Sequence, residues 1–71
     1  MVEVFKTNVS TPGEAHMLVG KIHEFFSGYK ANFDLEDCDK ILRVVSYSGS
    51  IEAASLISFM NDFGFYAEVI A

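Results

Sequence analysis

The residue types in this sequence that can do chemistry fall into three small groups. Thr11 and Glu14 lie three residues apart, His16 is followed directly by Met17, and Cys38 is the single cysteine. Imidazole, thioether and thiol groups are the ligands that soft metal ions prefer. His16, Met17 and Cys38 are therefore the candidates for a soft-metal site.

Thr11 and Glu14 also have a structural interpretation, which we favour. Thr11 suits the N-cap of a helix, and Pro12 suits the first helical position. Glu14 stands at the capping-box spacing, at which each side chain accepts a hydrogen bond from the backbone N–H of the other residue. We therefore expect a helix to begin here, stabilised by roughly 1 kcal/mol through its cap.

The metal candidates also have ordinary structural interpretations. His16 and His23 would be separated by about 10.5 Å along a helix, too far to chelate one ion easily. A solvent-facing histidine beside a space-filling methionine is the simpler account of His16 and Met17. Cys38 lies among acidic residues, which disfavour a thiolate, and the acidic residues between positions 34 and 39 lack the arrangement of a calcium loop. The sequence predicts no catalytic residue, no cofactor and no confident metal site.

Hydrophobic spacing predicts six elements that must position these groups. Alternation and β-forming residues predict strands over residues 2–9, 29–35, 40–48 and 65–70. Apolar stripes at steps of three and four predict two helices, one from the cap at Thr11 to Gly28 and one from a cap at Ser50 to Gly64. Between the second and third strands, residues 36–39 are expected to form a polar turn.

The order of these elements predicts the fold. Right-handed crossovers place the first and third strands in the centre of one sheet. We therefore expect an α+β fold, the ferredoxin-like βαββαβ plait, with a four-stranded antiparallel sheet in the order 4-1-3-2 and both helices on one face. The 71 residues form a single domain in this interpretation.

The uncovered face of that sheet is predicted to be apolar. Leu42 and Val44 are expected to face the helices, which turns their neighbours on the same strand outward. An open face this apolar is often an interface. The predicted interface consists of Phe5, Ile41, Val45, Tyr47 and Tyr66.

Two stretches resemble the heavy-metal-associated domain of copper chaperones and P-type metal ATPases. Residues 62–69, DFGFYAEV, are similar to the family's corner between the last helix and strand, and residues 28–35 look like its second strand. The family carries a Cys-x-x-Cys motif before its first helix, and those thiolates bind Cu(I). Thr11 and Glu14 stand at the two cysteine positions here. The resemblance implies the fold without the usual metal site.

Composition excludes several classes of protein. Ten acidic and five basic residues give a net charge of −5, which argues against binding a nucleic acid. One cysteine cannot form an internal disulfide, and no stretch approaches the length of a membrane span. The start of the sequence, Met1-Val2-Glu3, is acidic and has no apolar run behind basic residues, so we expect no signal peptide. We expect a cytoplasmic protein without membrane insertion.

These observations lead to a functional hypothesis and two alternatives. The leading hypothesis is a non-enzymatic binding or regulatory module that forms a homodimer or binds a protein partner through the open sheet face. The first alternative is a copper or zinc carrier that uses His16, Met17 or Cys38 from two or more chains. The second is an enzyme or small-ligand sensor with its site at a dimer interface.

Overall fold

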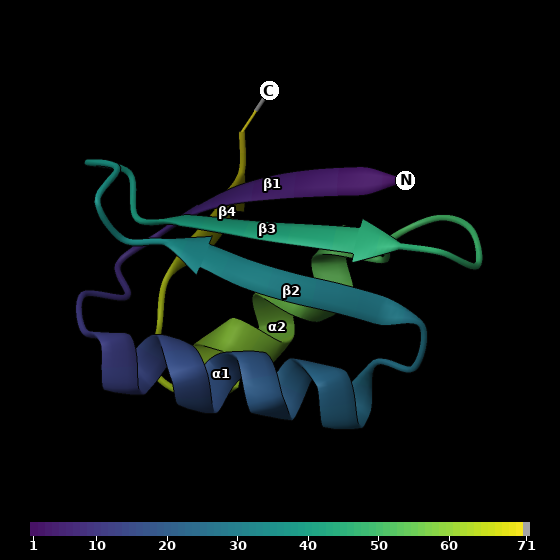
Figure 1. The fold of residues 1–71 in the computed structure, drawn as a ribbon, viewed down its shortest axis with the longest axis horizontal. Coiled ribbons are helices and arrows are strands. Elements are labelled where there is room, and N and C mark those ends of the chain that lie inside the picture. The colour runs from purple at the N-terminus through teal and green to yellow at the C-terminus, as the bar shows by residue number, and fades with distance from the viewer. Residues whose placement is uncertain (71) are drawn as a thin grey trace.

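A computed structural model describes residues 1–70, and the predicted order of elements is confirmed. The elements are β1 (Val2–Thr7), α1 (Pro12–Phe25), β2 (Tyr29–Asp34), β3 (Ile41–Ser46), α2 (Ala53–Asp62) and β4 (Ala67–Val69). The four strands form one antiparallel sheet in the order β2-β3-β1-β4, which reads 4-1-3-2 from the other edge. Both helices lie on the same face of this sheet (Figure 1). The chain has an α+β fold similar to a ferredoxin-like plait.

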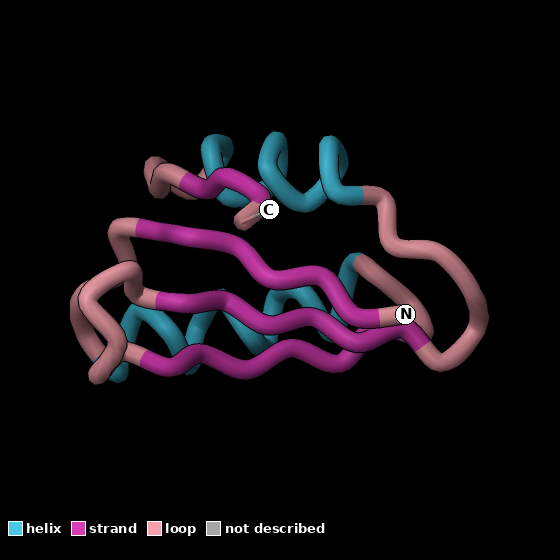
Figure 2. Tube along the Cα trace, turned by 90° about the horizontal axis from the view of Figure 1, so that it is seen from above, coloured by secondary structure: helices cyan, strands magenta, loops and turns pink. Residues whose placement is uncertain are grey.

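The sheet is an open layer with its helices on one side. Figure 2 looks onto the opposite side, where the strands lie in front of the helices. β1 occupies the interior of the sheet, and its Phe5 pairs with Leu42 of β3 and with Val69 of β4. β2 and β4 form the two edges.

The core lies between the sheet and the helices, and it includes Phe5. This side chain is fully buried, so its placement on the open face was wrong. Cross-strand neighbours share a face of the sheet, and Phe5 pairs with the equally buried Leu42. The sequence of β1 does not decide which of its faces packs on the helices. Val2 and Val4 lie on one face and Phe5 on the other, and all three residues favour strands.

β1 ends at Thr7, two residues before the predicted end. The hydroxyl of Thr7 accepts a hydrogen bond from the N–H of Val9 at 3.2 Å and donates to the carbonyl of Lys40. This side chain turns the backbone out of the strand, and Val9 is fully buried in the core beyond the turn. β4, whose Ala67 lies opposite Thr7, is also shorter than predicted.

The two helices begin in different ways. The capping box of α1 is present, as predicted. The N-cap of α2 is Glu52 and not Ser50, and it makes no side-chain capping bond. The backbone N–H of Glu52 donates instead to the Tyr29 hydroxyl at 2.8 Å, so a residue of β2 holds the start of α2. Within residues 1–70 neither helix has the length and apolar character needed to span a membrane.

Candidate functional site

Thr11 and Glu14 form a complete helix cap at the start of α1. The backbone N–H of Glu14 donates to the Thr11 hydroxyl at 3.2 Å. The Glu14 carboxylate accepts from the backbone N–H groups of Ser10 and Thr11, each at 3.3 Å. Both side chains are therefore used to satisfy the free N–H groups at the start of α1.

His16 and Cys38 lie in different surroundings. His16 is exposed on α1 and lines a groove of about 330 Å³ between that helix and β2. Cys38 is exposed in the loop between β2 and β3, and Met17 is 38% exposed on α1. Among residues 1–70, the one group of three or more potential His, Cys, Asp or Glu ligands consists of Asp37, Cys38 and Asp39. His16 does not belong to that group.

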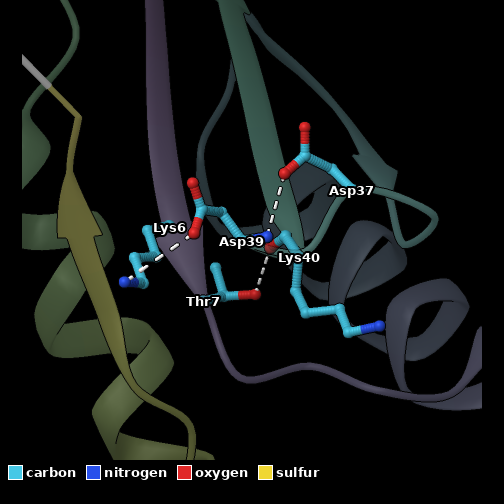
Figure 3. A network of polar contacts seen from close by, with 5 residues as sticks. All are labelled: Lys6, Thr7, Asp37, Asp39 and Lys40. Atoms are coloured by element: carbon cyan, nitrogen blue, oxygen red, sulfur yellow. Dashed lines mark hydrogen bonds and ion pairs between the residues drawn. The ribbon is translucent and has the colours of Figure 1, made fainter.

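The two carboxylates beside Cys38 already have structural partners (Figure 3). Asp37 accepts a hydrogen bond from the backbone N–H of Asp39 at 2.9 Å, and Asp39 forms an ion pair with Lys6 at 3.7 Å. In the same network, the backbone N–H of Thr7 donates to the Asp39 carbonyl at 3.0 Å. The loop between β2 and β3 is thereby fastened to the end of β1. Asp37 and Asp39 therefore stabilise the shape of the loop. The hydrogen bond from the Asp39 N–H to the side chain of Asp37, two residues earlier, is that of an Asx turn.

Two of the other four predicted interface residues, Ile41 and Val45, lie on β3 and are half-buried. Tyr47 directly follows β3 and Tyr66 directly precedes β4, and they are 77% and 46% exposed. Glu68 raises the pKa of the Tyr66 phenol by hydrogen bonding first and by its charge as well, and desolvation acts in the same direction.

Charged residues divide the open sheet face. Arg43 is exposed in the middle of β3, and Val4 of β1 lies opposite it. On the other side of β1, Lys6 lies opposite Glu68 of β4, so two more charged residues belong to this face. Charged side chains therefore lie among the apolar residues of this face. The role of these apolar residues as an interface stays a prediction.

A second apolar surface lies on the helical side, where aromatic rings connect α1 with α2. The ring of Phe59 on α2 lies within 6.1 Å, centre to centre, of three other rings: edge-on to Phe25 and Phe26, and tilted against Phe63. Phe26 stacks on Tyr29 at 5.5 Å. Aromatic pairs in such arrangements contribute about 0.5–1.5 kcal/mol beyond the area that they bury.

This aromatic cluster forms the floor and rim of an open groove of about 630 Å³. Phe59 is buried beneath it, whereas Phe25 and Phe63 are 61% and 37% exposed on either side. Ser55, Ser58 and Asp62 of α2 supply its polar groups; its complete lining is Phe25, Ala54, Ser55, Ser58, Phe59, Asp62 and Phe63. The lining of this open groove is mostly apolar.

The hydrophobic pattern did not locate this groove, although one signal was present. Phe25 and Phe26 are adjacent, and adjacent side chains on a helix point about 100° apart. One of the two rings therefore lies toward the edge of the buried stripe, and Phe25 takes that position. The pattern alone does not show that Phe63 closes the opposite side of the same groove.

Comparison with family models, with curated proteins and with solved structures gave no match for this chain. The resemblance to the heavy-metal-associated domain therefore stays a prediction.

Proposed function

We propose that this chain is a small, non-enzymatic binding module whose recognition site is the aromatic groove between α1 and α2. The observation that carries the proposal is the pair of exposed rings, Phe25 and Phe63, on either side of the buried Phe59. The groove takes an apolar or aromatic side chain from a protein segment, and that segment also carries a lysine or arginine.

The preference for a basic partner follows from charge. Asp62 is the last residue of α2, at the negative end of the helix dipole, and this helix has no basic residue in its last turn. The chain as a whole carries a net charge of −5. A cation beside the bound apolar side chain would meet both the Asp62 carboxylate and the negative end of the helix dipole.

The chemistry of the lining supports binding over catalysis. Ser55 and Ser58 offer hydroxyl groups, but a serine nucleophile needs a general base in hydrogen-bond reach and a group that orients that base. Asp62 is the one titratable residue among those that line the groove. The lining therefore offers no base and orienting partner of the kind that activates serine.

The fold assignment to the ferredoxin-like plait of the heavy-metal-associated type is part of this proposal. The capping box at Thr11 and Glu14 supports the interpretation that this chain is a relative of that family in which a helix start replaces the metal-binding loop. In such a relative, recognition of a protein segment replaces the capture of a metal ion. The groove is preferred to the open sheet face because charged residues interrupt that face.

Selection from a library of random short peptides displayed on phage tests the proposal. We expect the intact chain to enrich peptides in which an aromatic or large aliphatic residue lies near a lysine or arginine. Phe25→Ser and Phe63→Ser should abolish the enrichment, and Asp62→Lys should remove the preference for basic residues. Tyr47→Ser is the matched control, because it removes an exposed ring outside the groove.

Amide chemical shifts of the labelled chain, recorded with a synthetic copy of one enriched peptide, identify the bound surface. Shifts concentrated on the end of α1 and on α2 support the proposal. Enrichment that survives the loss of both phenylalanines, or shifts confined to the strands, would overturn it.

A further inference from the structure

β2 lies at one edge of the sheet and presents backbone groups on its outer side. The N–H of Ala31 points outward, because it donates to the side chain of His23 and not to β3. Outward and inward backbone groups alternate along an antiparallel strand, so the N–H and C=O groups of Phe33 point outward as well. This edge is a template for a further strand.

The side chains of β2 on the open face are complementary to themselves. Lys30, Asn32 and Asp34 are exposed and follow one another at every second position. If a second copy of β2 pairs antiparallel about a two-fold axis at Asn32, Lys30 of each copy faces Asp34 of the other. Opposite charges directly across a strand pair are favourable, and the symmetry supplies this contact twice.

The helical side of the edge fits the same arrangement. About the axis at Asn32, the small Ala31 lies opposite Phe33 of the second copy, and these two residues exchange outward backbone hydrogen bonds. A groove of about 330 Å³ runs beside the strand between α1 and residues such as Phe33 and Leu35. The groove gives the phenyl ring of the second copy a place beside Val19 of α1.

Moving the axis along the strand weakens this complementarity. With the axis at Ala31, Lys30 would face Asn32 of the second copy, and Asp34 would face a residue beyond the end of β2. Within the bounds of β2, the axis at Asn32 pairs both charged residues with opposite charges. The charge pattern therefore specifies the register as well as the partner.

We propose that two copies of this chain associate through their β2 edges, antiparallel and centred on Asn32, to form a continuous eight-stranded sheet. In this dimer the N–H of Ala31 leaves His23 and pairs with the carbonyl of Phe33 in the second copy. The proposal does not depend on the aromatic groove, which lies between the two helices.

A charge exchange tests the association. Sedimentation equilibrium over a range of concentrations should show a monomer and dimer in exchange. Lys30→Asp and Asp34→Lys each place like charges across the interface twice, and each should weaken the dimer about ten-fold. The double variant restores opposite charges and should recover most of the lost affinity. Glu68→Lys makes the same charge change as Asp34→Lys at an exposed residue of β4, the opposite edge of the sheet, and should leave the dimer intact.

Disulfide formation tests the register. In a Cys38→Ser background, Asn32→Cys brings two cysteines together at the axis, where paired Cα atoms are about 4.5 Å apart and a disulfide can form. Lys30→Cys is the matched control on the same strand and face. Its two cysteines would lie about 13 Å apart along the sheet and should not cross-link.

Each result bears directly on the proposal. Recovery of the dimer in the charge-exchanged variant and cross-linking through Asn32→Cys alone support it. A monomer at every concentration would overturn it, as would a double variant no better than the single ones or equal cross-linking by Lys30→Cys. The substituted residues are exposed, and circular dichroism of each variant checks that the fold is retained.

Discussion

The Nε2 atom of His23 accepts a hydrogen bond from the backbone N–H of Ala31 at 3.0 Å. A side chain of α1 thus occupies a backbone donor at the outer edge of β2. As the acceptor of this hydrogen bond, Nε2 carries no proton in the contact.

Replacing His23 by alanine should expose this amide. We expect the Ala31 N–H to exchange with solvent about five-fold faster, since one hydrogen bond contributes about 1 kcal/mol net. Hydrogen exchange followed by NMR, at a concentration where the chain is monomeric, measures this change. His16→Ala on the same helix is the control and should leave the exchange rate of Ala31 unchanged. An unchanged rate in His23→Ala would mean that the imidazole does not protect the amide.

Phe5 and Tyr47 should respond oppositely to truncation. Phe5→Ala removes a fully buried ring and should lower the free energy of unfolding by about 3–5 kcal/mol. Tyr47→Ala removes a ring that is 77% exposed and should change it by less than about 0.5 kcal/mol. Urea unfolding followed by circular dichroism compares the two. If Phe5→Ala does not fold, Phe5→Leu should still show a clear loss, and equal stabilities of the Phe5 and Tyr47 variants would contradict the burial.

The helix cap should contribute to stability on its own. Thr11→Ala removes the acceptor for the Glu14 N–H and should lower the free energy of unfolding by about 1 kcal/mol. Thr11→Ser keeps a hydroxyl at the same position and should retain most of that stability. Thermal and urea unfolding of the three proteins measure the difference. A Thr11→Ala variant as stable as the intact chain would show that the capping box contributes nothing.

Tyr66 should ionise at a higher pH than an ordinary tyrosine. Glu68 raises its pKa through a hydrogen bond and its charge, so Glu68→Gln should move the pKa back toward the usual value of 10.0. The folded chain holds the phenolic proton more tightly than the unfolded chain. This contribution to stability is therefore complete below about pH 10 and declines as the pH rises above it. NMR of labelled tyrosine rings resolves Tyr66 from the other two tyrosines and follows both effects.

Local signals in the sequence were enough to predict the order of elements and the start of α1. Thr11, Pro12 and Glu14 act on neighbouring backbone groups, so their spacing alone specifies a cap. The apolar stripes specified which helix faces pack on the sheet. The sheet order followed from the handedness of the crossovers.

Features that depend on distant residues were not predicted. The face taken by Phe5 depends on its register with Leu42 and Val69, which lie on other strands. The start of α2 depends on the hydroxyl of Tyr29, and the groove requires rings from both helices. These contacts join residues that are far apart in the sequence, so they produce no periodic pattern within one short segment.

The interior position of β1 also has a consequence for how the chain is made. The side chain of Asn8, directly after β1, accepts the backbone N–H of Tyr66 at a separation of 58 residues. β1 is therefore synthesised before β3 and β4, the two strands with which it pairs. Its pairing cannot be complete until β4 has left the ribosome. During that interval β1 can pair with β3 alone, and its second edge is open to other nascent chains.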